Sequence, residues 1–162
     1  MKMEVYKNSG FSIIELVLII VIIGLLSISV FIKWPGLVIN LGAQAEQLAN
    51  DIRYTQSLSM TNGQRYRLVI ASSNTYQILN NSGTAIKLAM GNSTMTLNSG
   101  ITFGTLTNLP NNLIAFDGNG IPYTDTGNPG TQLSATATIP LVGSGNTKNV
   151  SISPQTGRTI VQ

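Results

Sequence analysis

The stretch KNSGFSIIELVLIIVIIGLLS, Lys7 to Ser27, places one ionisable residue, Glu15, at the start of an otherwise apolar run. From Leu16 to Ile32 no residue is charged. A carboxylate within a bilayer costs about 2–3 kcal/mol at the centre of a membrane helix and less near the interface. The stretch therefore predicts a buried or membrane-spanning helix and requires a separate reason for Glu15.

The apolar run predicts a transmembrane helix. From Phe11 to Ile32 it would extend about 33 Å as an α-helix, close to the hydrocarbon thickness of about 30 Å. A secretory signal peptide would be shorter and would end in a small-x-small cleavage site, and neither feature is present. Lys33-Trp34 closes the run as an interfacial pair, and the positive-inside rule leaves Lys2 and Lys7 in the cytoplasm.

Gly10, Phe11 and Glu15, with a short basic leader before them and an apolar helix after them, resemble the type IV prepilin signal. The resemblance implies cleavage by a prepilin peptidase between Gly10 and Phe11 and N-methylation of Phe11. It also implies that Glu15 serves filament assembly. Glu15 would then pair with the α-amino group of Phe11 on a neighbouring subunit, so that each charge compensates the other. The alternative is a stray glutamate at the membrane boundary of an ordinary anchor.

A second helix is predicted after the sequence KWPG, Lys33 to Gly36, which interrupts the first because proline lacks an amide donor. An apolar stripe with helical spacing then runs to Asn62-Gly63, a normal helix stop. The stripe consists of Leu37, Leu41, Ala45, Leu48, Ile52 and Thr55. It indicates an amphipathic helix of about 25 residues that packs on a sheet.

Beyond Gly63 the pattern changes to short β-strands separated by turns. The segments 64–71 and 75–79 predict a hairpin across Ser72-Ser73-Asn74, and 132–142 predicts a pair with 148–154. Further strands are expected at 85–90, 94–97, 101–106, 113–116 and 158–161. Strands this short favour antiparallel sheets or a small sandwich over parallel βαβ units.

The helix sequence from Ala45 to Ile70, followed by SPQTGR at Ser153–Arg158, is similar to GspH/FimT-type minor pilins and pseudopilins. MSHA-type minor pilins have similar sequences in these regions. The resemblance implies an α+β, pilin-like fold in which the C-terminal half of a long N-terminal helix packs on antiparallel sheets. The expected divisions are a leader at 1–10, a transmembrane or filament-core helix at 11–34, an amphipathic helix at 35–63 and a β-rich head at 64–162.

The composition argues against catalysis, since the chain has no cysteine and no histidine. A catalytic triad with histidine and a cysteine nucleophile are therefore impossible. Outside the apolar run the carboxylates of the later chain are Glu46, Asp51, Asp117 and Asp125, and the first two lie on different faces of the predicted helix. We expect no enzyme activity and no cofactor.

The loop from Asp117 to Gln132 has an oxygen-rich start, with Asp117, Asn119 and Asp125 as candidate calcium ligands. An EF-hand loop would require Gly at its sixth position and Glu at its twelfth, where this chain has Pro122 and Asn128. The Asp-Gly and Asn-Gly pairs are better explained as turn formers. No metal site is expected, with a weak calcium site as the alternative.

DNA binding is a second alternative, because some FimT-type minor pilins capture DNA through a C-terminal Gly-Arg-x-Arg. Here the corresponding residues are Gly157-Arg158-Thr159-Ile160, so the second arginine is absent. Phosphate binding depends on several cations acting together. The candidates are Arg65, Arg67, Lys148 and Arg158, and the alternative is a solvated strand face.

The expected function is a minor pilin or pseudopilin, a structural subunit of a type IV pilus or of a type II secretion pseudopilus. Its expected partners are other pilin subunits, the prepilin peptidase, an inner-membrane assembly platform and, before assembly, the lipid bilayer. The head would lie in the periplasm on a single-pass anchor in the bacterial inner membrane. A pilus-displayed DNA receptor and an anchored periplasmic protein unrelated to filaments are the alternatives.

Overall fold

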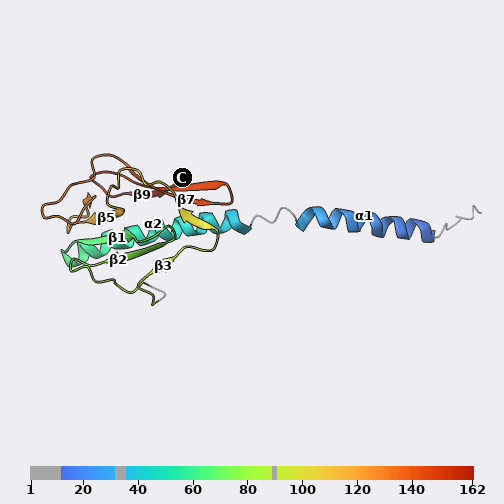
Figure 1. The fold of residues 1–162 in the computed structure, drawn as a ribbon, viewed down its shortest axis with the longest axis horizontal. Helices are drawn as coiled ribbons and strands as arrows, with labels where there is room; N and C mark the ends of the chain where they lie inside the picture. Colours follow the sequence, from blue (N-terminus) through green and yellow to red (C-terminus); the bar gives the residue numbers. More distant parts are fainter. Residues whose placement is uncertain (1–11, 32–35, 89–90) are drawn as a thin grey trace, which may run out of the picture. The chain divides into compact units, whose positions relative to one another are not determined.

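Two helices precede all the strands in the computed structural model (Figure 1). The structure describes residues 12–31, 36–88 and 91–162. It separates into two units, Met1–Pro35 with helix α1 (Ile13–Phe31), and Gly36–Gln162 with helix α2 (Gly36–Asn62) and the strands. We call the second unit the head. The amphipathic helix therefore belongs to the same unit as the β-strands.

Helix α1 begins directly after Ser12, whose carbonyl oxygen accepts hydrogen bonds from the backbone N–H groups of Glu15 and Leu16 (3.0 and 3.2 Å). Its large apolar side chains from Ile13 to Ile23 are exposed in the isolated chain, from 42% at Ile19 to 84% at Ile13. None of the helices formed by the described residues is both long and apolar enough to span a membrane.

Helix α2 confirms the predicted amphipathic helix. Leu41, Ala45, Leu48 and Ile52 are at most 1% exposed, and Thr55 is fully buried. The helix ends at Asn62 because Gly63 adopts a left-handed conformation (φ +62°), which glycine tolerates without a Cβ clash. The predicted break at KWPG falls largely on residues 33–35, which lie outside the described residues.

The strands form two antiparallel sheets. Sheet A has the order β3-β2-β1-β5-β6, and sheet B has the order β4-β7-β8-β9. The strands of sheet A are β1 Tyr66–Ile70, β2 Thr75–Leu79, β3 Met95–Thr96, β5 Leu113–Phe116 and β6 Pro122–Tyr123. Those of sheet B are β4 Ile101–Phe103, β7 Ala137–Gly143, β8 Asn146–Ile152 and β9 Thr159–Val161. The predicted antiparallel arrangement and both predicted hairpins are confirmed.

Several details differ from the sequence-based expectation. The strands expected at 101–106 and 132–142 are shorter, β4 at Ile101–Phe103 and β7 at Ala137–Gly143. The segment 85–90 was expected to be a strand, but among its described residues only Ala85 makes a bridge, to Leu79. Strand β6 was not expected, because two residues that include Pro122 give no alternating pattern. It forms because Tyr123 and Pro122 pair with Ala115 and Phe116 of β5.

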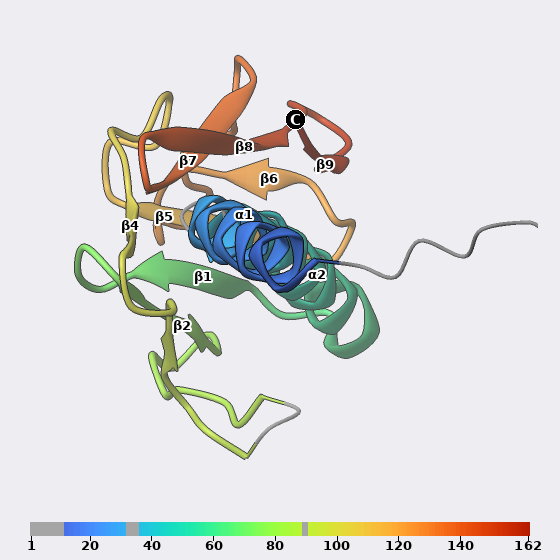
Figure 2. The same cartoon turned by 90° about the vertical axis from the view of Figure 1, so that its right-hand side faces the viewer.

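Helix α2 lies between the two sheets, with β1 and β2 on one side and β7, β8 and β9 on the other (Figures 1 and 2). Alternating residues of β7 and their partners on β8 point inward, as the period of two requires. The sheets also join by a backbone hydrogen bond from Phe103 N–H of β4 to the carbonyl oxygen of Ser73, in the turn between β1 and β2 (2.7 Å). The buried face of this one helix therefore shares a single core with both sheets. Its buried members include Leu41, Leu48, Ile52, Leu68, Tyr76, Ile78, Ile114, Phe116, Ile139, Leu141, Val150 and Ile152.

Candidate functional site

The first candidate region is the start of α1, where Glu15 lies at the third helical position after Ser12. The sequence Ser12-Ile13-Ile14-Glu15 is the pattern of a capping box, in which the glutamate supports the helix start. A carboxylate here also interacts favourably with the positive end of the helix dipole. The serine three residues before the glutamate could have indicated this pattern, although the described residues show no side-chain hydrogen bond of Ser12 or Glu15. Gly10 and Phe11, the predicted cleavage residues, lie outside the described residues.

The C-terminal turn Ser153–Arg158, the SPQTGR segment, is held against α2 by Gln56. The side-chain amide of Gln56 donates hydrogen bonds to the carbonyl oxygens of Thr156 (2.9 Å) and Gly120 (2.8 Å). Arg53, one turn earlier, donates to the carbonyl oxygen of Thr159 at 2.8 Å. Two polar side chains of α2 therefore fix the segments before and within β9.

Gly157 is required where this turn meets the helix. A Cβ atom at Gly157 would lie 2.6 Å from Gln56 Nε2 and 2.8 Å from the Phe116 ring, and the residue has φ +64°. Any larger residue here would be destabilising, both because its Cβ atom would overlap these neighbours and because L-residues rarely adopt a positive φ. The glycine of the segment that resembles the GspH/FimT family therefore has a packing role in this head.

The loop from Asp117 to Gln132 is fixed by Arg65, which immediately precedes β1. Its guanidinium donates hydrogen bonds to the carbonyl oxygens of Gly127 and Pro129 and lies 4.0 Å from the centre of the Tyr123 ring. Cation–π and charge-assisted hydrogen bonds together hold this loop to sheet A. Arg65 is therefore already engaged within the head.

The carboxylates proposed as calcium ligands serve the same loop. Asp117 accepts hydrogen bonds from the N–H groups of Asn119 and Ile121, both at 2.9 Å. Asp125 accepts from the N–H groups of Thr131 (3.0 Å) and Gly127 (3.1 Å). Hydrogen bonds from Thr131 hold the pKa of Asp125 below its ordinary value, with smaller contributions from Gly127 and Arg65. This arrangement fits the turn-forming interpretation.

The weak calcium alternative finds no cluster of acidic ligands in the described part of the chain. No group of three or more histidine, cysteine, aspartate or glutamate residues lies close enough there to hold a metal ion. Asp117 and Asp125 act as acceptors for backbone amides, as just described.

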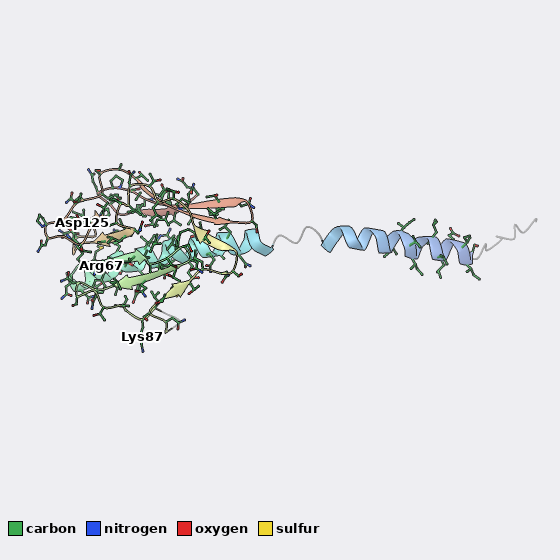
Figure 3. All side chains as sticks on the ribbon, viewed as in Figure 1. Arg67, Lys87 and Asp125 are labelled. Carbon is green, nitrogen blue, oxygen red and sulfur yellow. The ribbon has the colours of Figure 1, made fainter. Side chains whose placement is uncertain are left out.

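The four candidate DNA-binding cations are divided between the two sheets. Arg65 and Arg67 belong to the outward face of sheet A, where Arg67 is labelled in Figure 3. Lys148 lies on β8, and Arg158 precedes β9 and pairs with Ser153 beyond the other end of β8. Five residues along a strand correspond to about 16 Å, so these two cations are far apart on sheet B. Figure 3 also labels Lys87, on the segment after β2.

A buried polar pair was not expected from the sequence. The Tyr76 hydroxyl on β2 donates a 2.6 Å hydrogen bond to the Asp51 carboxylate on α2. Burial raises the pKa of Asp51, and the bond from Tyr76 partly opposes that rise. Burial, together with the Asp51 charge, also raises the pKa of Tyr76. The sequence placed Asp51 only on a different helix face from Glu46, because nothing local indicates its partner on β2.

Comparison with known proteins places this architecture in a family. Residues 44–156 match the family model described as "Type II transport protein GspH". Two crystal structures of the Pseudomonas aeruginosa (strain PAO1) type IV minor pilin FimU, in space groups P21 and P65, have the same fold. Each gives a TM-score of 0.53 over 75% of this chain, with 18% and 17% identity and coverage of 87% and 92% of the FimU chains. No curated protein matches the chain.

The two findings have different weight. An identity below one fifth shows a shared fold alone. The family match, by contrast, covers most of α2 and nearly all strands of the head, including Gln56 and both of its hydrogen-bond partners, Gly120 and Thr156. Because it spans more than half of the sequence, the chain belongs to the GspH family of type II transport proteins.

Proposed function

We propose that this protein is a minor pilin or pseudopilin, a structural subunit that the prepilin peptidase cuts between Gly10 and Phe11 before assembly. The observation that carries the proposal is helix α1 on a chain of the GspH family. Its exposed large apolar side chains, from Ile13 to Ile23, form a surface unsuited to water. Such a helix requires lipid or the helices of other subunits around it.

Membrane insertion before assembly is part of the same proposal. The proposed anchor, 11–34, extends beyond the described residues at both of its ends. Its support is the sequence: 17 consecutive uncharged residues, closed by Lys33-Trp34. The head would then face the periplasm, and assembly would transfer the helix from lipid to the core of a pilus or pseudopilus.

Processing is tested by intact-mass measurement on the protein extracted from the membrane of an expressing bacterium that contains a prepilin peptidase. The expected mass begins at Phe11 and carries one additional methyl group. The matched control is Gly10→Val, which blocks the proposed cut and should retain the leader. A mass that begins at Met1 in the unchanged protein would remove the prepilin assignment.

The role of Glu15 is tested with two substitutions that separate charge from helix capping. Glu15→Gln preserves a capping-box side chain but removes the charge, whereas Glu15→Ala removes both. If Glu15 pairs with the Phe11 amino group of a neighbouring subunit, both variants are cut and inserted normally and both are lost from sheared filaments. If Glu15→Gln assembles as well as the unchanged protein, the charge pairing is wrong and capping is sufficient.

DNA capture has no comparable support, because the candidate cations are separated and Arg65 is engaged with its own loop. The test is a mobility shift of duplex DNA at low salt, with Arg158→Ala and Lys148→Ala as variants. We expect no shift at physiological salt. A salt-sensitive shift that Arg158→Ala abolishes would restore the receptor alternative.

A further inference from the structure

A polar cavity of about 290 Å³ lies at the end of the head where α2 finishes. It is lined by Gln64 and Arg65 before β1, by Asn81 after β2, and by Asp117, Thr126 and Asn128 of the long loop. The volume is at the lower end of the range for small-molecule sites, about 300–1,000 Å³. The cavity therefore has room for a compact ligand, and none of its lining residues belongs to helix α1.

The walls of the cavity are fixed before any ligand arrives. Arg65 is held by the carbonyl oxygens of Gly127 and Pro129 and by the Tyr123 ring. Asp117 Oδ1 accepts two backbone N–H groups at 2.9 Å. The backbones of Gly63 and Gly118, which also line the cavity, approach closely: a Cβ atom at Gly118 would lie 3.2 Å from Gly63 Cα. Arg65 and Asp117, which are already held, lose little conformational entropy on binding.

Several polar groups at the cavity remain available. Among the described residues, the side chains of Gln64, Asn81, Thr126 and Asn128 make no hydrogen bond, and each lines the cavity. Asp117 Oδ2 has only a long contact, 3.4 Å, from the Tyr123 hydroxyl. Carboxamides and hydroxyls both donate and accept hydrogen bonds. The cavity thus offers both hydrogen-bond donors and hydrogen-bond acceptors to a ligand.

This chemistry selects the class of ligand. The Arg65 cation and the Asp117 anion balance one another, so neither a phosphate nor a metal cation meets an excess of opposite charge. A ligand with many hydroxyl groups, each a donor and an acceptor, complements carboxamides that are themselves both. An apolar ligand would leave these groups desolvated and unpaired.

We propose that this cavity, which we call the Arg65 cavity, binds an uncharged, hydroxyl-rich ligand of the size of one carbohydrate ring. The ligand would be a free sugar or one residue of a glycan. This binding is independent of the assembly role of α1, since every lining residue belongs to the head.

The experiment is nitrogen-15 NMR of the full chain in dodecylphosphocholine micelles, a detergent without a sugar headgroup. The probes are D-glucose, D-galactose, D-mannose and N-acetyl-D-glucosamine, and a short oligomer of any sugar that binds. We expect the side-chain amide signals of Gln64, Asn81 and Asn128 to shift with at least one sugar. Tighter binding of the oligomer than of the single ring would identify a glycan as the source.

The variants separate the site from the surface. Thr126→Val with Asn81→Ala removes a hydroxyl and a carboxamide, so we expect affinity to fall about tenfold. Thr126→Ser retains the hydroxyl and should retain affinity. Asn98→Ala removes a similarly exposed turn asparagine away from the cavity, and affinity should not change.

Two results would overturn the proposal. One is the absence of any shift at these amides with about 100 mM sugar, a hundredfold above a 1 mM Kd. The other is a response to sodium sulfate or calcium chloride while the sugars give none. Neither result would affect the prepilin assignment, which rests on cleavage and on Glu15.

Discussion

At the residue scale, the clearest constraint on the head is the absence of a side chain at Gly157. Gln56 and Phe116 occupy the space that a Cβ atom would need, while the positive φ excludes L-residues for a second reason. In the sequence, this glycine stands out only through a family resemblance. Its packing role depends on contacts about 100 residues away along the chain, and no local pattern encodes such contacts.

The glycine can be tested against a matched position. Gly145 also has a positive φ (+75°), but a Cβ atom there meets nothing within 4 Å. We expect Gly145→Ala to lower the free energy of unfolding by about 1–2 kcal/mol, the cost of the left-handed conformation. Gly157→Ala should cost a further 1–3 kcal/mol or so from overlap with Gln56 and Phe116. Urea unfolding of both variants measures the difference, and equal losses would contradict the packing argument.

The Asp51–Tyr76 pair makes head stability depend on pH. Burial raises the folded-state pKa of Asp51 above its unfolded value of about 3.9. As pH rises, the unfolded chain therefore releases the Asp51 proton at a lower pH than the folded head does. The stability linked to that proton is complete below about pH 3.9 and is lost as pH rises through the folded-state pKa. Ionisation of Asp51 therefore lowers the free energy of unfolding of the head.

The matching variant is Asp51→Asn, which retains an acceptor for the Tyr76 hydroxyl and does not titrate. We expect the unfolding free energy of the variant, relative to that of the unchanged protein, to increase as pH rises from about 4 to about 7. Urea unfolding at each pH gives the comparison. Parallel pH profiles for the two proteins would show that Asp51 has the same pKa folded and unfolded.

At the scale of elements, the sequence was most informative where a pattern repeats. Helix α2 was predicted within one residue at each end because its apolar stripe, its break at Pro35 and its stop at Gly63 agree. β5 was predicted at its observed bounds, Leu113–Phe116. The segment 85–90 was wrong over its described residues because its apolar residues contact the core without a strand partner, apart from the single Ala85 bridge.

The shape of the loop from Asp117 to Gln132 depends on a residue far away in the sequence. Its glycines and prolines indicated an irregular connection, but its fixed shape comes from Arg65, more than 60 residues earlier. We expect Arg65→Ala to weaken local protection of residues 124–131 by about 1–2 kcal/mol, since it removes two charge-assisted hydrogen bonds and a cation–π contact. Native-state hydrogen exchange measures this protection.

Arg67→Ala is the control for that loop. Arg67 lies two residues later on the same face, and its side chain makes no hydrogen bond within the described part of the chain. Exchange in 124–131 should remain unchanged in this variant. If both substitutions release the loop equally, general loss of positive charge rather than the specific contacts of Arg65 would be responsible.

At the scale of the whole molecule, the head carries its own core, and that core includes one face of α2. The α+β class and the antiparallel sheets were predictable from the change of period after Gly63. The merging of α2 with both sheets into one unit was not, because no sequence pattern tells which sheet a helix covers. For the candidate sites, the assembly role of Glu15 stays a prediction from its register with Gly10 and Phe11, whereas the Arg65 cavity depends entirely on tertiary contacts.

Independence of the head is a testable consequence. We expect a protein that begins at Gly36 to unfold in urea with the same free energy as the full chain in micelles, because its buried residues all follow that position. The control begins at Ala49 and lacks Leu41, Ala45 and Leu48. Each buried leucine contributes about 2–5 kcal/mol, so this control should not fold. A marked loss of stability in the protein that begins at Gly36 would show that residues 1–35 support the head.

The contact between Arg53 and Thr159 also determines when the head can finish folding. These residues are 106 positions apart, so α2 leaves the ribosome long before the strand that meets it. At about 5–20 residues per second, translation alone separates them by roughly 5–20 s. During that interval the apolar stripe of α2 has no completed sheet to cover it. The newly made chain therefore remains open to a holding chaperone or an export channel until β9 has been synthesised.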